Sequence, residues 1–177
     1  MEKKLLELLP EIELIEDKDL REKVIKTFLR AIELGGWKEE ELEQIPFTLL
    51  IPDTSINLFQ HTRAVTLSAL GVYEAYERVY GKINPLRRDV LIAGALLHDV
   101  GKLLEYGKEN GKVVKSPRGK LLRHPFSGMA LAWEIGLPDD VCHIIALHAK
   151  EGEGSKRIPE AVIVHYCDFS NFEPFKK

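Results

Sequence analysis

The residues of this chain best suited to chemistry are an adjacent histidine and aspartate, His98 and Asp99, in the pentapeptide HDVGK. They follow the apolar run 90–97, and a helix that is apolar on all sides is normally buried. A buried imidazole and a buried carboxylate both need partners, and both are good ligands for divalent first-row metals. The structural alternative is a helix that ends with polar residues and with Gly101 as its left-handed cap. The pair alone does not decide between a metal site and a helix end.

Three further polar residues fall on the apolar faces of other predicted helices. His61 lies on the apolar stripe of a long helix. His148 follows Ile144 by four residues on a second helix, and Asp168 follows Val164 by four on a third, so each points inward. A single histidine on an apolar face is more often a packed core residue than a ligand. An inward aspartate among apolar residues is harder to explain by packing. One shared metal would explain all of these residues.

The chain resembles the HD superfamily of metal-dependent phosphohydrolases over about residues 55–170. The pattern of that family, a histidine, a His-Asp pair and a later aspartate, is matched by His61, His98, Asp99 and Asp168. The resemblance implies an all-helical fold in which these four residues bind a divalent metal.

Two more histidines resemble the residues that supply a second metal in the binuclear branch, which includes the HD-GYP phosphodiesterases and ribonuclease Y. By that resemblance, Asp99 bridges to a second metal held by His124 and His148. The chain lacks the GYP tripeptide and the paired histidines of the HD-GYP enzymes, which argues against hydrolysis of cyclic di-GMP. Its segment 159–168 is more similar to ribonuclease Y, although the coiled-coil and RNA-binding parts of that enzyme have no counterpart in this sequence.

The other two histidines are not expected to bind metal. His143 and His148 are five residues apart, about 140° around a helix, so the two cannot easily share one ion. His165 lies three residues before Asp168, and we expect it to support a ligand or to pack rather than to bind directly.

The predicted chemistry is hydrolysis of a phosphoester. Two close divalent cations lower the pKa of a water between them and bind phosphate oxygens, so hydroxide can attack without a protein nucleophile. Asp99 and Lys102 are the predicted catalytic residues, because Lys102 could neutralise a phosphoryl oxygen in the transition state. A solvated lysine near a helix end is the structural alternative. The histidine-rich ligand set favours two ions of Mn, Fe, Zn, Co or Ni over Mg.

A basic segment lies between the predicted ligands Asp99 and His124. Residues 102–123 carry a net charge of +5 in a chain whose net charge is −3. A solvated face is one interpretation of such a charge run. Its position favours an anionic substrate, a phosphorylated small molecule or a nucleotide, with the candidate contacts Lys115, Arg118 and Lys120. RNA is less favoured, because the net charge argues against general coating of nucleic acid.

The sequence therefore predicts a metal-dependent phosphohydrolase that acts on a nucleotide or a cyclic nucleotide. A phosphodiester is preferred because residues for a second metal are present. The alternatives are a nucleoside monophosphatase, a small ribonuclease, and a non-catalytic module that binds a nucleotide or a partner. Six predicted ligands and Lys102 argue against that module, because a structural metal needs no open coordination position.

The elements that must position these residues are helices almost throughout. We predict helices over residues 2–9, 19–34, 38–44, 55–80, 86–100, 125–135, 138–150 and 159–169. Pro52–Ser55 should cap the long helix, and Asn110-Gly111 should form a type I′ turn. The predicted fold class is all-α, an HD-domain helical bundle over residues 51–177. Residues 1–50 should form extra helices that pack on it or build a homodimer surface.

Composition agrees with one globular domain, because 177 residues with 45% hydrophobic and 30% charged side chains can bury a core. No apolar stretch is long enough for a membrane span, and the N-terminus shows no signal-peptide pattern. Cys142 and Cys167 fit no disulfide framework, so we expect a cytoplasmic protein.

Overall fold

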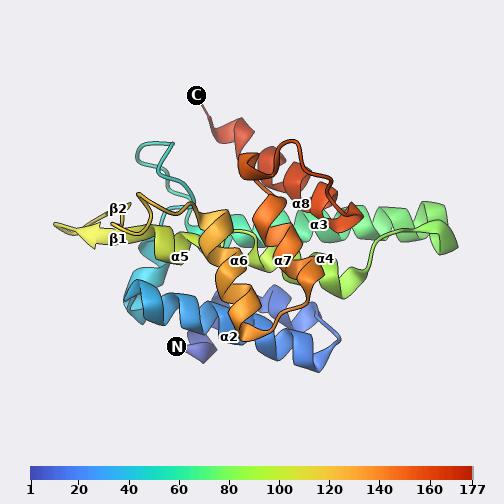
Figure 1. Ribbon diagram of the computed structural model, residues 1–177, viewed down its shortest axis with the longest axis horizontal. Coiled ribbons are helices and arrows are strands. Elements are labelled where there is room, and N and C mark those ends of the chain that lie inside the picture. Colours follow the sequence, from blue (N-terminus) through green and yellow to red (C-terminus); the bar gives the residue numbers. More distant parts are fainter. Residues whose placement is uncertain (177) are drawn as a thin grey trace.

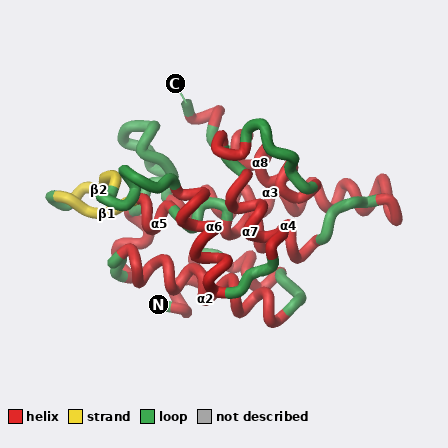
Figure 2. Tube along the Cα trace, in the orientation of Figure 1, coloured by secondary structure: helices red, strands yellow, loops and turns green. Residues whose placement is uncertain are grey.

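The computed structural model describes residues 1–176, and these form eight α-helices and one small hairpin, so the predicted all-α fold is confirmed (Figures 1 and 2). The α-helices are α1 (Glu2–Leu8), α2 (Lys18–Gly35), α3 (Leu58–Tyr80), α4 (Arg88–Leu97), α5 (Lys102–Glu105), α6 (His124–Ile135), α7 (Asp139–Leu147) and α8 (Pro159–Ser170). Short 3-10 helices are η1 (Pro10–Leu14), η2 (Glu39–Gln44), η3 (Gly81–Ile83), η4 (Lys150–Gly152) and η5 (Glu173–Phe175). Among the described residues, no helix has the length and apolar character that a bilayer span requires.

Helix α4 lies at the centre of the bundle, as its apolar sequence predicts. It packs against α2, α3, α7 and α8, and Figure 1 shows it between α2 on one side and α8 on the other. Every residue from Leu91 to Leu97 is buried. At Gly94, a Cβ would lie 2.4 Å from Cδ1 of Ile144 in α7. The close approach of α4 and α7 therefore requires glycine at this position.

The N-terminal helices share the main hydrophobic core. Leu5 of α1 and Phe28 of α2 are buried in the same cluster as Leu97 of α4. The indole Nε1 of Trp37 donates a hydrogen bond of 2.8 Å to the carbonyl oxygen of Leu103. These contacts join residues 1–50 to the helices that follow, while the domain division at residue 50 stays a prediction.

The helix predicted over residues 86–100 is shorter than expected. Helix α4 ends at Leu97, and α5 begins at Lys102 after a turn. Gly101 has a φ of −64°, so its interpretation as a left-handed cap is wrong. Glycine is required there for space, because a Cβ would lie 2.0 Å from the carbonyl oxygen of His124. This contact brings the His-Asp pair against the start of α6.

The loop before α3 also differs from the prediction. The cap of α3 is Asn57 rather than a residue of Pro52–Ser55, and Oδ1 of Asn57 accepts a 2.9 Å hydrogen bond from the backbone N–H of Gln60. The preceding chain doubles back, so that the N–H of Phe47 donates to the carbonyl oxygen of Ile56 at 3.2 Å. The loop is thereby folded onto the first turn of α3.

The basic segment contains the antiparallel hairpin of β1 (Tyr106–Glu109) and β2 (Lys112–Lys115), drawn in yellow in Figure 2. Asn110 and Gly111 have φ values of 51° and 76°, as the predicted type I′ turn requires. The hairpin projects from the bundle beyond α5 (Figure 1).

Candidate metal centre and active-site pocket

Four histidines and two aspartates meet beside the end of α4. All six are predicted metal ligands. They come from five helices, in or directly after each one: His61 (α3), His98 and Asp99 (after α4), His124 (α6), His148 (after α7) and Asp168 (α8). The predicted helix over residues 138–150 ends earlier, at Leu147, so His148 lies at the end of α7 rather than within it.

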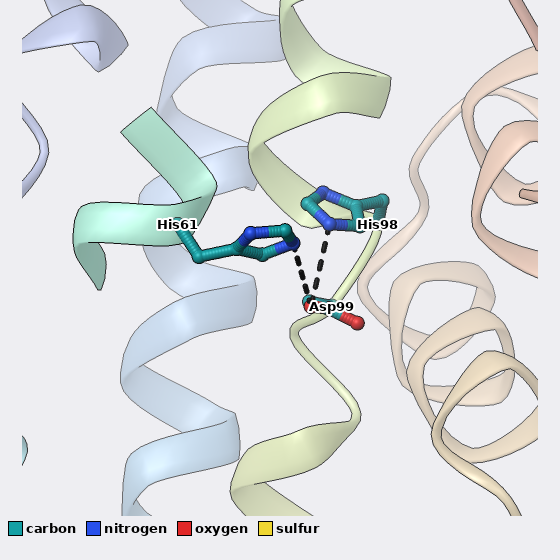
Figure 3. A group of neighbouring side chains, drawn as sticks. All are labelled: His61, His98 and Asp99. Atoms are coloured by element: carbon teal, nitrogen blue, oxygen red, sulfur yellow. Dashed lines mark ion pairs between the residues drawn. The ribbon is translucent and has the colours of Figure 1, made fainter. Parts of the chain in front are cut away.

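Asp99 lies at the centre of this cluster and presents one carboxylate oxygen to each half. Oδ2 lies 3.6 Å from Nε2 of His61 and 3.3 Å from Nε2 of His98 (Figure 3). Oδ1 lies 3.2 Å from Nε2 of His124 and 3.7 Å from Nε2 of His148. Each half has the spacing of a three-residue metal site, with ligand atoms within 4.8 Å of one another. The two halves share the Asp99 carboxylate.

Asp168 belongs to the first half of the cluster. Its Oδ1 lies 3.0 Å from Nε2 of His61 and 3.9 Å from Nε2 of His98. Burial alone would raise the pKa of Asp168, but the hydrogen bond with His61 and the charge of His98 lower it to about 2. The carboxylate is therefore ionised near neutral pH and can serve as a ligand.

Hydrogen bonds at the outer ring nitrogens orient the imidazoles. Nδ1 of His98 donates to the carbonyl oxygen of Ala95 at 2.7 Å, and Nδ1 of His148 donates to that of Ile145 at 2.7 Å. Because a carbonyl oxygen can only accept, the neutral form of each ring carries its proton on Nδ1. The lone pair of Nε2 is then directed at Asp99, which is the arrangement typical of metal-binding histidines.

Glu105 supports His124, and the sequence reasoning did not identify it. Its Oε2 accepts hydrogen bonds from the backbone N–H of His124 at 2.7 Å and from Nδ1 at 2.9 Å. Burial would raise the pKa of Glu105, but the hydrogen bond and charge of His124 lower it to about 2. The available signal was an acidic residue inside the strongly basic segment 102–123.

Glu105→Gln is expected to weaken metal binding at the half of the cluster that contains His124, by about 10- to 100-fold. Glutamine preserves the size of the side chain and one acceptor, but it removes the charge that makes His124 more basic. Titration of the metal in competition with a chromogenic chelator measures the change. Glu109→Gln, an exposed acid in β1, is the matched control. Wild-type affinity in Glu105→Gln would contradict this role.

The donor set fits a divalent metal. Nε2 of His98 is buried and has no hydrogen-bond partner in the part of the chain that the structure describes, and such an atom is costly unless a ligand satisfies it. Burial lowers the pKa of His61 and lowers that of His124 to about 4. Both rings are therefore neutral near pH 7, as metal binding requires.

Lys102 lies against the same carboxylate. Its Nζ lies 2.5 Å from Oδ2 of Asp99 and donates to the carbonyl oxygen of Phe47 at 2.6 Å. Burial would lower the pKa of Lys102, but the charge of Asp99 raises it above its usual value. Burial would likewise raise the pKa of Asp99, but Lys102 and His98 hold it well below its usual range. The pair is ionised, with a fixed positive charge beside the cluster.

A comparison with known families decides the classification, because the model of the HD domain matches residues 58–169. The chain belongs to the HD-domain family. The match spans α3 to α8 and includes all six residues of the cluster. The expected resemblance is confirmed.

One curated relative is similar to this HD-domain chain over most of its length. It is a protein of Methanocaldococcus jannaschii named dihydroneopterin 2',3'-cyclic phosphate phosphodiesterase, 33% identical over 168 residues. The aligned region covers 88% of this chain and 64% of the relative, so the chain spans less than two thirds of the length of that protein. No solved structure gives a significant match.

Four residues of the HD-domain cluster, His61, Asp99, His124 and Asp168, line a pocket of about 240 Å³. Of the predicted substrate contacts, Lys115 lines this pocket, with its Nζ 3.4 Å from Oε1 of Glu105. Arg118 and Lys120 are exposed and are not among its lining residues. The other cations at the pocket wall are Lys102, Arg123 and Lys150, together with Lys176 near the C-terminus.

The two remaining histidines lie outside the cluster. Nδ1 of His165 donates to the carbonyl oxygen of His148 at 2.5 Å, which helps to hold the end of α7. Nε2 of His143 accepts a 3.2 Å hydrogen bond from the backbone N–H of Ile158. Neither contact places a ring nitrogen at Asp99.

Proposed function

We propose that this HD-domain chain is a metal-dependent phosphohydrolase that cleaves a phosphodiester. The observation that carries the proposal is the position of Asp99, whose two oxygens face two separate histidine pairs. That arrangement suits two divalent ions, for which His61, His98, Asp99 and Asp168 would hold one and Asp99, His124 and His148 the other. Imidazole-rich donors favour Mn, Fe, Zn, Co or Ni over Mg.

The metal ions, when bound, supply Lewis acidity and a water of lowered pKa. The chain itself supplies the remaining functions. Lys102 is protonated and held beside Asp99, so it can stabilise negative charge that develops on a phosphoryl oxygen. Lys115, Arg123 and Lys150 line the route to the cluster and attract an anion.

We propose a cyclic phosphate of a nucleoside or of a related heterocyclic compound as the substrate. The name of the relative describes a 2',3'-cyclic phosphate phosphodiesterase, which favours a diester over a monoester. RNA as a substrate, a homodimer and a cytoplasmic location stay predictions. Cys142 and Cys167 are free and buried, in agreement with the expectation that no disulfide forms.

The test is the ratio of metal to protein in the wild type and in His124→Ala after reconstitution with Mn or Fe. We expect a ratio near two that falls toward one in the variant, together with loss of metal-dependent hydrolysis of 2',3'-cyclic nucleotides. His143→Gln is the matched control, because that ring lies outside the cluster. A wild-type ratio near one that the substitution leaves unchanged would contradict the two-metal proposal.

A further inference from the structure

The pocket has two chemically different walls, and the proposed function uses only one of them. The cluster and the lining cations, Lys102, Lys115, Arg123 and Lys150, are suited to bind a phosphoester. Another part of the lining, the aromatic wall, is apolar, and its residues come from the loop before α3 and from the chain at and after the end of α8: Phe47, Leu49, Leu50, Phe169 and Phe172. A phosphate group makes no use of such a surface.

The aromatic wall begins at the cluster and extends outward. The ring of Phe47 is fully buried, and its centroid lies 4.9 Å from that of His61. The ring of Phe172 lies beyond it, with centroids 6.1 Å apart and an interplanar angle of 64°. A group in contact with Phe172 can therefore belong to the same molecule as a group at Asp99.

The outer part of this wall is accessible. Leu50 is 75% exposed and Leu49 is 37% exposed, although both line the pocket, and Phe172 is partly buried. Exposed apolar side chains that line a concave site are typical of ligand contact rather than of packing.

We propose that Phe172 and Leu50, with Phe47 behind them, form a subsite that binds the planar heterocycle of the substrate, a nucleobase or a pteridine. This inference rests on the proposed function and adds the part of the substrate, beyond the phosphoester, that the pocket recognises. Aromatic heterocycles stack on aromatic side chains with little dependence on sequence or substituents. The aromatic wall and the cationic lining residues then suit the two ends of one molecule, a planar heterocycle that stacks through its faces and an anionic phosphoester.

The test compares two cyclic phosphodiesters, 2',3'-cyclic GMP and glycerol 1,2-cyclic phosphate, which has the same five-membered cyclic phosphate but no aromatic heterocycle. Phe172→Ala should lower kcat/KM for 2',3'-cyclic GMP by about tenfold or more and leave that for the glycerol compound unchanged. Phe172→Leu, which keeps apolar volume but not the aromatic ring, should show an intermediate loss. Trp133→Ala is the control, because Trp133 is an aromatic residue that is 68% exposed on α6 and is not a lining residue of the pocket.

Equal losses for both compounds, or no loss for either, would overturn the subsite. If the wild type hydrolyses neither compound, the proposed function fails, and the subsite is then tested by binding alone. Calorimetry with the Mn-reconstituted protein would compare guanosine 2'-monophosphate with glycerol 2-phosphate. Weaker binding of the nucleotide alone in Phe172→Ala would support the subsite, and equal nucleotide affinity in the variant and the wild type would overturn it.

Discussion

Asp99→Asn is expected to lower kcat/KM for a 2',3'-cyclic nucleotide by about 10³-fold and to reduce the metal content. Asparagine keeps the shape of the side chain but removes its charge and replaces one of its two oxygens with an amide nitrogen. Since each oxygen faces a different histidine pair, neither orientation of the amide can serve both halves of the cluster. Steady-state kinetics and elemental analysis of the same preparations measure the two effects.

The loss in Asp99→Asn is informative only if the protein still folds, so circular dichroism and thermal unfolding of the variant are part of the experiment. Asp139→Asn, at an exposed position in the first turn of α7, is the matched control. An Asp99→Asn protein with wild-type metal content and activity would contradict the bridging role of this carboxylate.

Lys102→Met is expected to lower kcat by about 100-fold while the metal content stays at the wild-type level. Methionine retains an unbranched apolar side chain and removes the positive charge that lies 2.5 Å from Asp99 Oδ2. Because Lys102 is not a metal ligand, its loss should weaken stabilisation of the phosphoryl group and leave the cluster intact. Loss of activity without loss of metal would therefore distinguish Lys102 from Asp99.

Lys108→Met is the matched control for this experiment, because Lys108 belongs to the same basic segment but pairs with Glu41 on the surface at 2.8 Å. In the competing interpretation, Lys102 has only a structural role, which is to neutralise the negative charge of Asp99. Wild-type kcat in Lys102→Met, with an altered thermal stability, would favour that interpretation and remove Lys102 from the catalytic residues.

The sequence was most informative where a polar residue breaks an apolar helical face. His61, His148 and Asp168 each lie on such a face, and the structure places all three at the His98-Asp99 pair. Side-chain direction along a helix follows from its local periodicity, so inward residues can be recognised before the partner helices are known. The need of buried polar groups for a partner suggested a shared metal, and the family resemblance assigned the individual ligands.

Contacts between distant segments could not be derived in this way. Glu105 supports His124 across 19 residues, and its position in a basic segment gives no indication of which side chain it faces. The basic run predicted an anion-binding surface, but only the fold of the hairpin and the following turn separates Lys115, at the pocket, from the exposed Arg118 and Lys120.

The sequence by itself therefore predicted the all-helical class, the central apolar helix and the candidate site residues, because hydrophobic periodicity is a local property of the chain. Tertiary structure decided the break between α4 and α5, where the carbonyl oxygen of His124 leaves no space for a Cβ at Gly101. It also brings the ring of Phe172 next to that of Phe47 to form the aromatic wall. Both depend on which segments pack together, and no local pattern specifies that choice.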